Sequence, residues 1–231
     1  MNKPPSSLLS RRDVCRQLLG LAGTAPLAMS WLSASPKAIA DEIHGHIMRV
    51  EEDWYIKIGT PDPDSDSPQI TTVMSPAWST PGGGYGVFDL NCATQPNFSS
   101  GGVQIQYWSN NAIVQSQSNA CWDSLRFTDE EITYTSVMRV EDNELVFEVI
   151  NGTSSTWGSF GMGELIVRYP SWRNHLNHYD PDCSAYNSRI GWSSYEVRSF
   201  VLQRARCYSN NGLESTDNTP RVLHQYDPSA G

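Results

Sequence analysis

The sequence predicts an all-β fold in which two antiparallel sheets pack face to face as a sandwich. Apolar and polar residues alternate over short segments, which is the pattern of strands with one buried face. Clusters of Gly, Pro, Asn, Asp and Ser separate these segments, as turns between strands do. The sequence has no helical stripe over three turns, and the nearest candidate, residues 171–179, is short and lies between two prolines.

The first predicted strand, residues 53–59, sets the pattern for the others. It places Trp54, Ile56 and Ile58 on one face and polar or amphipathic residues on the other. Further strands are predicted at residues 68–76, 85–91, 101–109, 112–118, 163–170 and 195–208, with an edge strand at 221–225.

The clearest hairpin covers residues 131–152. Two strands flank a turn at residues 141–143, and Leu145, Phe147 and Val149 share one face. Nine or ten strands without helices favour two packed sheets.

Residues 1–40 have the organisation of an export signal peptide. A basic segment is followed by an apolar run and then by small residues, and Ala38 and Ala40 place a cleavage site before Asp41. The alternative is an uncleaved membrane anchor, because the apolar run has about the 20 residues that a spanning helix needs.

The basic segment resembles the twin-arginine export signal, with Ser10, Arg11 and Arg12 in the places of that motif. Val14 and Cys15 stand where the motif usually has Phe-Leu. The resemblance implies that the chain crosses the membrane already folded and works in the periplasm or outside the cell. Proteins exported in this way often carry a cofactor loaded in the cytoplasm.

Cleavage would leave one domain with a connector at 41–50, a sandwich at 51–212 and a polar C-terminal tail at 213–231. By its length and number of strands, the body is similar to jelly-roll or concanavalin-like sandwiches rather than to smaller immunoglobulin-like units.

The charge of the chain disfavours polyanionic partners. Five of the 16 basic residues and one of the 25 acidic residues lie in residues 1–40, which leaves a formal charge of −13. Lys57 is then the only lysine, and a basic stripe for nucleic acid or anionic lipid is missing from the sequence. We expect an extracellular glycan or a component of the cell envelope as partner, and no membrane span after cleavage.

Four cysteines follow the signal, and an even number in an exported chain predicts two disulfides with three alternative pairings. The simplest pairing joins neighbours, Cys92 with Cys121 and Cys183 with Cys207.

Two clusters contain side chains that bind metals. Asp62, Asp64 and Asp66 alternate between prolines and could offer three oxygens to calcium, although the spacing is not that of an EF-hand. The alternative is a charged connector between strands. The second cluster consists of His175, His178, Asp180 and Asp182. It could hold a metal with an open position for water, or it could be a polar loop closed by a disulfide.

A mixture of amides and aromatic rings indicates a surface for sugars, whose apolar faces stack on rings while amides bind their hydroxyls. In residues 101–109 the core-facing positions are Val103, Ile105 and Tyr107. The opposite face then carries Gln104, Gln106 and Trp108, and the glycine-rich segment 151–163 adds Trp157 and Phe160.

Signatures of catalysis are missing from the sequence. Glu144 and Glu148 lie on one face of one strand, about 13 Å apart, which is too far for the paired carboxyls of a glycosidase. Nucleophile elbows, zinc-protease motifs and nucleotide loops are absent. Three hypotheses follow: a noncatalytic exported module that binds glycans, a structural or adhesive envelope protein, and a secreted polysaccharide hydrolase or lyase.

Overall fold

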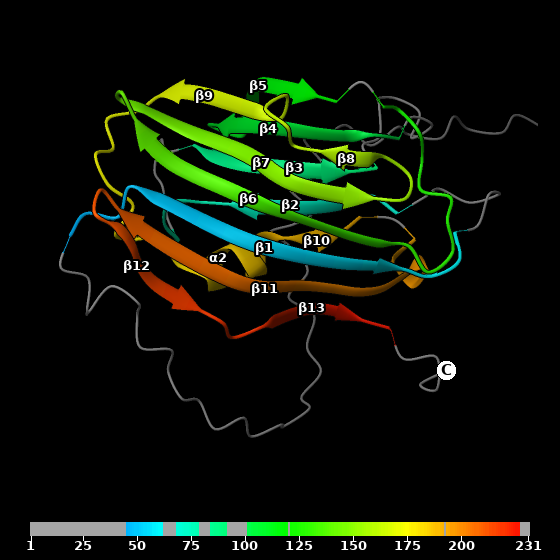
Figure 1. The fold of residues 1–231 in the computed structure, drawn as a ribbon. Helices are drawn as coiled ribbons and strands as arrows, with labels where there is room; N and C mark the ends of the chain where they lie inside the picture. Colours follow the sequence, from blue (N-terminus) through cyan, green and yellow to red (C-terminus); the bar gives the residue numbers. More distant parts are fainter. Residues whose placement is uncertain are drawn as a thin grey trace, which may run out of the picture. The chain divides into compact units, whose positions relative to one another are not determined.

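Two antiparallel sheets with a shared apolar core form the fold in the computed structural model (Figure 1), which confirms the predicted all-β sandwich. The structure describes residues 45–61, 68–78, 84–91, 101–119, 121–191 and 193–226, all within the unit Lys37–Gly231. Several sequence predictions fall outside these ranges: the export signal at 1–40, Asp62, Asp64, Asp66 and Cys92.

The larger sheet has the strand order β12-β11-β1-β6-β7-β8, and β13 and β9 pair with β11 and β7. Every pairing in this sheet is antiparallel. Because β1 pairs with both β6 and β11, it lies between them in the middle of the sheet. Its strands are β1 (Arg49–Ile58), β6 (Glu131–Glu141), β7 (Glu144–Ser154), β8 (Gly158–Phe160), β9 (Ile166–Pro170), β11 (Val197–Ser209), β12 (Gly212–Asp217) and β13 (Arg221–Gln225).

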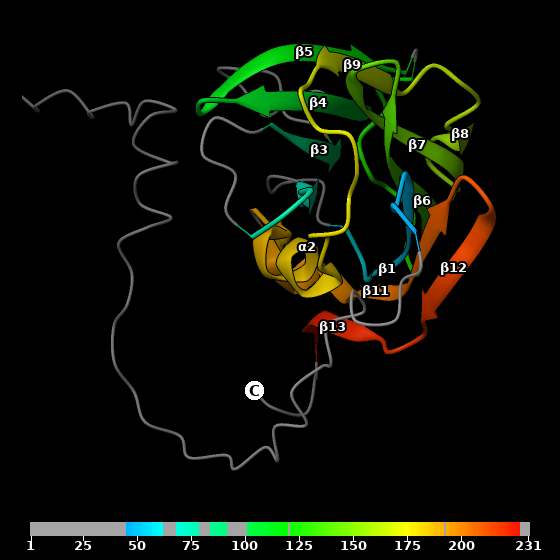
Figure 2. The same cartoon turned by 90° about the vertical axis from the view of Figure 1, so that its left-hand side faces the viewer.

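The smaller sheet has the order β10-β2-β3-β4-β5 and is also antiparallel. Figure 2 shows β2, β3, β4 and β5 in one layer beside the layer formed by β1, β6 and β7. The strands of the smaller sheet are β2 (Ile70–Met74), β3 (Tyr85–Leu90), β4 (Val103–Ser109), β5 (Ala112–Ser118) and β10 (Arg189–Ile190).

The core lies between the inner faces of the two sheets, where the alternation in the sequence predicts it. Strand β1 contributes Trp54, Ile56 and Ile58, all fully buried. The predicted inner faces of β4 (Val103, Ile105, Tyr107) and β7 (Leu145, Phe147, Val149) are buried in the same cluster. Burial of this apolar surface is the main force that holds the sheets together.

The sheets approach each other closely at Gly86 on β3. A Cβ atom there would lie 2.4 Å from Cδ1 of Phe147 on β7, so only glycine fits at this position. Larger residues would push the layers apart or displace the ring.

Tight turns fix the register of two hairpins. Asp142 and Asn143 join β6 to β7 with φ angles of 50° and 63°, and Asn110 and Asn111 join β4 to β5 with φ angles of 51° and 60°. Two consecutive residues with positive φ are typical of the type I′ turn, whose twist matches that of the strands.

The helix of the structure differs from the candidate at residues 171–179. Helix α2 (Pro181–Asn187) starts after that segment, with Asp180 as its N-cap. Proline is favoured in the first turn of a helix because its missing N–H would be unpaired there, so Pro181 begins the helix rather than excluding it. Helix α2 packs against β2 and β13. Of the helices in the part of the chain that the structure describes, none is long and apolar enough to cross a membrane.

The sequence predicts that the sandwich ends at residue 212, but in the structure it continues beyond this residue. Strands β12 and β13 both pair with β11, so the segment assigned to a polar tail belongs to the larger sheet up to Gln225. The predicted edge strand at 221–225 is confirmed. The N-terminal boundary also differs, because β1 begins at Arg49, inside the predicted connector.

Candidate functional site

The outward face of the smaller sheet carries the amides and the ring that the sequence predicts there. Gln104, Gln106 and Trp108 alternate on β4 with residues of the core, so they lie on the opposite side of the sheet. The cross-strand partners of Gln104 and Trp108 on β3 are Asp89 and Tyr85, which therefore share this face. We call these five residues, together with Thr71 on β2, the outer polar face.

Asp89 is the centre of a hydrogen-bond network on this face. Its Oδ1 accepts from Thr71 Oγ1 at 2.5 Å, and its Oδ2 accepts from Gln106 Nε2 at 3.1 Å. Gln106 also donates to Gln104, whose own amide nitrogen donates to Ser118 on β5 at 3.1 Å. The amides are therefore held in fixed orientations from β2 to β5.

Two aromatic rings lie at one end of the outer polar face. Tyr85 and Trp108 are half-buried, and their near-parallel rings have centroids 6.3 Å apart. Trp108 Nε1 donates to Gln106 Oε1 at 2.7 Å, which fixes the indole relative to the amides. Exposed Ile113 on β5 lies across from Trp108. Gln106 itself is only 6% exposed, so it positions Trp108 rather than presenting its own amide to solvent.

Trp157 and Phe160 do not belong to this surface. Their side chains are 6% and 1% exposed and pack in the core, so the prediction that they lie on a ligand-binding loop is wrong. Phe160 packs where Gly152 leaves room, because a Cβ on Gly152 would lie 2.2 Å from its ring. Gly152 thus serves close packing, as does Gly161, where a Cβ would lie 2.5 Å from the carbonyl oxygen of Val149.

The predicted metal ligands Asp180 and Asp182 have other partners. Asp180 caps helix α2 by accepting from the backbone N of Asp182 at 2.9 Å, and it accepts from Trp78 Nε1 at 2.6 Å. Asp182 forms an ion pair with Arg221 at 2.5 Å. These contacts occupy the carboxylates with capping and ion pairing.

His175 and His178 lie near a third histidine that the sequence does not connect with them. The rings of His46 and His175 stack with centroids 5.0 Å apart, and His178 lies 5.9 Å from His175. Burial, His46, His178 and Arg173 all lower the pKa of His175. Across the described ranges, no group of three or more His, Cys, Asp or Glu side chains is arranged to hold a metal ion.

The predicted disulfide between Cys183 and Cys207 is not formed, since both thiols are free and buried. Cys183 Sγ donates to the carbonyl oxygen of Ala77 at 3.8 Å, whereas Cys207 lies on β11. Burial is the main cause that raises the pKa of each thiol to about 11. Cys121 is free as well, and its predicted partner Cys92 lies outside the described ranges.

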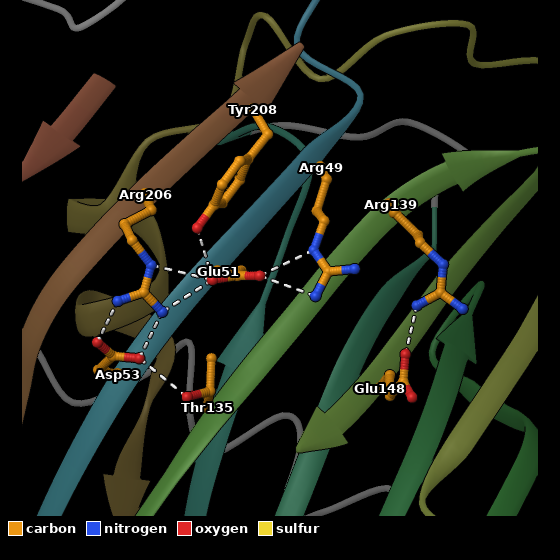
Figure 3. Close-up of polar contacts among 8 residues, drawn as sticks. All are labelled: Arg49, Glu51, Asp53, Thr135, Arg139, Glu148, Arg206 and Tyr208. Atoms are coloured by element: carbon orange, nitrogen blue, oxygen red, sulfur yellow. Dashed lines mark hydrogen bonds and ion pairs between the residues drawn. The ribbon is translucent and has the colours of Figure 1, made fainter. Parts of the chain in front are cut away.

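The outward face of the larger sheet carries a dense set of charged side chains (Figure 3). Arg206 on β11 lies between Glu51 and Asp53 of β1, with nitrogen–oxygen distances of 2.8 Å to Glu51 and 2.6 Å to Asp53. Tyr208 donates to Glu51 at 2.9 Å, and Thr135 donates to Asp53 at 2.9 Å. We call this set the charged face: Arg49, Glu51, Asp53, Thr135, Arg139, Glu148, Arg206 and Tyr208.

Two carboxylates of the charged face, Glu51 and Asp53, are held in their ionised form. Burial alone would raise the pKa of Glu51, but hydrogen bonds from Tyr208 and Arg206 and the charge of Arg49 lower it. The same opposition lowers the pKa of Asp53, where burial is outweighed by the hydrogen bonds from Arg206, Arg204 and Thr135 together with the charge of Arg206. Hydrolysis of a glycosidic bond near neutral pH needs one carboxyl with a raised pKa to act as acid. Glu51 and Asp53 are therefore unsuited to that role.

Glu52 is the carboxyl with a raised pKa that the sequence analysis missed. It points into the core from β1, is fully buried, and accepts from Tyr179 OH at 2.7 Å and Trp54 Nε1 at 3.2 Å. Burial raises its pKa to about 7, against the lowering effect of these hydrogen bonds. The alternation Val50, Glu52, Trp54 in the sequence was the signal that could have revealed it.

Glu52 does not line the cavity that lies between the described parts of the two sheets. The cavity between the sheets that is lined by Thr72, Phe88 and Val149 has a volume of about 10 Å³, which is about the space of one water molecule. The full burial of Glu52 and its hydrogen bonds from Tyr179 and Trp54 are those of a buried structural group.

Comparison of the sequence with protein-family models and with curated proteins finds no match.

Proposed function

We propose that this chain is an exported, noncatalytic protein that binds a carbohydrate on the outer polar face of the smaller sheet. The observation that carries the proposal is the arrangement of Trp108 and Tyr85 at the end of a row of fixed amides. Aromatic rings offer the apolar face of a sugar a stacking surface, and amide and hydroxyl groups beside them bind its hydroxyls. Export rests on the signal predicted at residues 1–40.

The proposal of a noncatalytic role is supported by four acidic side chains, each of which is either engaged with neighbours or buried. Glu51 and Asp53 are engaged with arginines, Asp89 accepts hydrogen bonds from neighbours on its own face, and Glu52 is fully buried. A hydrolase needs two carboxyls facing one cleft, one of them able to give up a proton. These four acids do not offer such a pair.

The proposal predicts that Trp108→Ala weakens binding of its glycan. The domain without residues 1–40 is screened on a glycan array, and the affinity of each hit is measured by calorimetry. We expect about a tenfold loss for Trp108→Ala, because one stacking contact contributes roughly 1 kcal/mol.

Trp172→Ala is the matched control, since Trp172 is 82% exposed and follows β9 of the larger sheet, so it is not one of the residues of the outer polar face. Its affinity should equal that of the wild type. If Trp108→Ala and Trp172→Ala change the affinity equally, or if no glycan on the array binds, the proposal is refuted. The hypothesis of a structural envelope protein would then be favoured.

A further inference from the structure

A second pair of aromatic rings lies outside the outer polar face and is more exposed than the first. Trp78, in the segment after β2, is 54% exposed, and Tyr186 on α2 is 80% exposed. Their ring centroids are 5.9 Å apart, and their planes are inclined by 50°. Two large rings that meet at the surface without being covered by the chain need an explanation.

These rings are held in defined positions. Trp78 Nε1 donates to Asp180 Oδ2 at 2.6 Å, and the other oxygen of Asp180 caps α2, the helix that carries Tyr186. One carboxylate thus connects both aromatic residues. Because their positions are fixed before a ligand arrives, binding would cost little conformational entropy.

The second pair lies toward the same end of the smaller sheet as Trp108. Strand β2 ends with Met74, which pairs with Gly86, the neighbour of Tyr85 on β3. The segment with Trp78 therefore leaves the sheet at the end that carries Tyr85 and Trp108. Adjacent strands are about 4.8 Å apart, which places β2 about 10 Å from the strand of Trp108. The aromatic rings are thus spread across several strands, over more than the length of one sugar ring.

We infer that Trp78 and Tyr186 form a second contact for an extended glycan chain that runs across the strands from Trp108 to helix α2. The inference rests on the proposed function and adds that the ligand is an oligomer rather than a single terminal sugar. The glycan chain should be neutral, because the protein without residues 1–40 has a formal charge of −13 and repels polyanions, and the outer polar face contains the carboxylate of Asp89.

The dependence of affinity on ligand length tests the inference. Neutral manno-, xylo-, cello- and chito-oligosaccharides of two to six units are titrated into the domain without residues 1–40, with polygalacturonate as an anionic comparison. The best neutral series should gain affinity up to at least four units. Trp78→Ala and Tyr186→Ala should keep the wild-type affinity for the disaccharide and lose the gain with length, about tenfold for the hexasaccharide.

The outcomes separate this inference from the proposed function. If affinity is already maximal for the disaccharide and depends on Trp108 alone, the second contact is refuted while the carbohydrate site stands. Unchanged hexasaccharide binding in both Trp78→Ala and Tyr186→Ala would also refute the second contact. If polygalacturonate binds more strongly than the neutral oligosaccharides, the inference that the glycan chain is neutral is wrong. If none of the oligosaccharides binds, both proposals fall. Trp172→Ala again controls for the loss of an exposed ring.

Discussion

At the scale of single residues, the buried carboxyl of Glu52 is expected to make stability depend on pH. In the unfolded chain it titrates near its ordinary pKa of 4.5, whereas burial raises its pKa to about 7 in the folded protein. Between these values the unfolded chain releases a proton that the folded protein keeps, so the free energy of unfolding falls as pH rises. Below pH 4.5 both the folded and the unfolded state hold the proton, so Glu52 no longer lowers the free energy of unfolding.

Glu52→Gln should remove this pH dependence. Urea denaturation between pH 4 and pH 8 should show wild-type stability falling relative to the variant by on the order of 3 kcal/mol, since one pKa unit corresponds to about 1.4 kcal/mol. Tyr179→Phe keeps the carboxyl of Glu52 but removes a hydrogen bond that lowers its pKa. The free energy of unfolding of this variant should therefore go on falling to a higher pH than that of the wild type. Parallel profiles for the wild type and Glu52→Gln would contradict this account.

Individual site residues were predictable only where the alternation of a strand decides their direction. It places Trp108 and Gln104 outward, and the structure agrees. It does not reveal that Gln106 is covered, because that depends on its neighbour Asp89 on another strand. Trp157 was misplaced because a glycine-rich segment has the composition of an exposed loop, while here it packs into the core.

At the scale of strands, the charged face links β1 to β11 through Arg206. Its side chain is 16% exposed, and its partners Glu51 and Asp53 are 12% and 17% exposed, so water screens these ion pairs only in part. Removing Arg206 would leave two half-buried carboxylates without their main partner. Such a loss costs more than the loss of a fully solvated ion pair.

Arg206→Gln should therefore lower the free energy of unfolding at pH 7 by about 2 kcal/mol. Arg204→Gln is the control: Arg204 also bonds Asp53, but its side chain is 46% exposed, and its loss should cost less than about 1 kcal/mol. Glu51 and Asp53 have lowered pKa values, so their contribution is present above their ordinary pKa values and is lost as pH falls through the lower folded ones. The effect of Arg206→Gln should thus shrink near pH 3, and a difference independent of pH would speak against this role.

The strands themselves were largely predictable, since the alternating segments correspond to β1 to β7, β9, β11 and β13. Strands β8, β10 and β12 and helix α2 were not, and β8 and β10 have only three and two residues. Helix α2 is only seven residues long and is stabilised by the cap of Asp180 and its packing on β2, which a search for a long apolar stripe cannot detect. Strand β12 is mostly polar and exposed, so its sequence reads as a tail.

At the scale of the whole domain, the C-terminal strands complete the larger sheet. Strands β12 and β13 cover the outer edge of β11, and Arg221 of β13 pairs with Asp182 and Asp217. A chain cut after residue 212 would expose this edge and leave Asp182 without Arg221. An uncovered edge also promotes pairing between molecules.

We therefore expect a chain ending at residue 212 to unfold at a clearly lower temperature than one ending at residue 226, with a loss of about 3 kcal/mol or more. Thermal denaturation followed by circular dichroism measures the difference, and hydrogen exchange should locate it in β11. Equal melting temperatures would show that the tail boundary predicted from the sequence was correct in energetic terms.

The position of β1 between β6 and β11 also determines when the protein can fold. A ribosome that has synthesised β1 must still add about 150 residues before β11 emerges, so one side of this central strand lacks its partner for most of translation. Contacts between residues so distant along the chain close slowly. We therefore expect the larger sheet to be completed only after most of the last third of the chain has been synthesised.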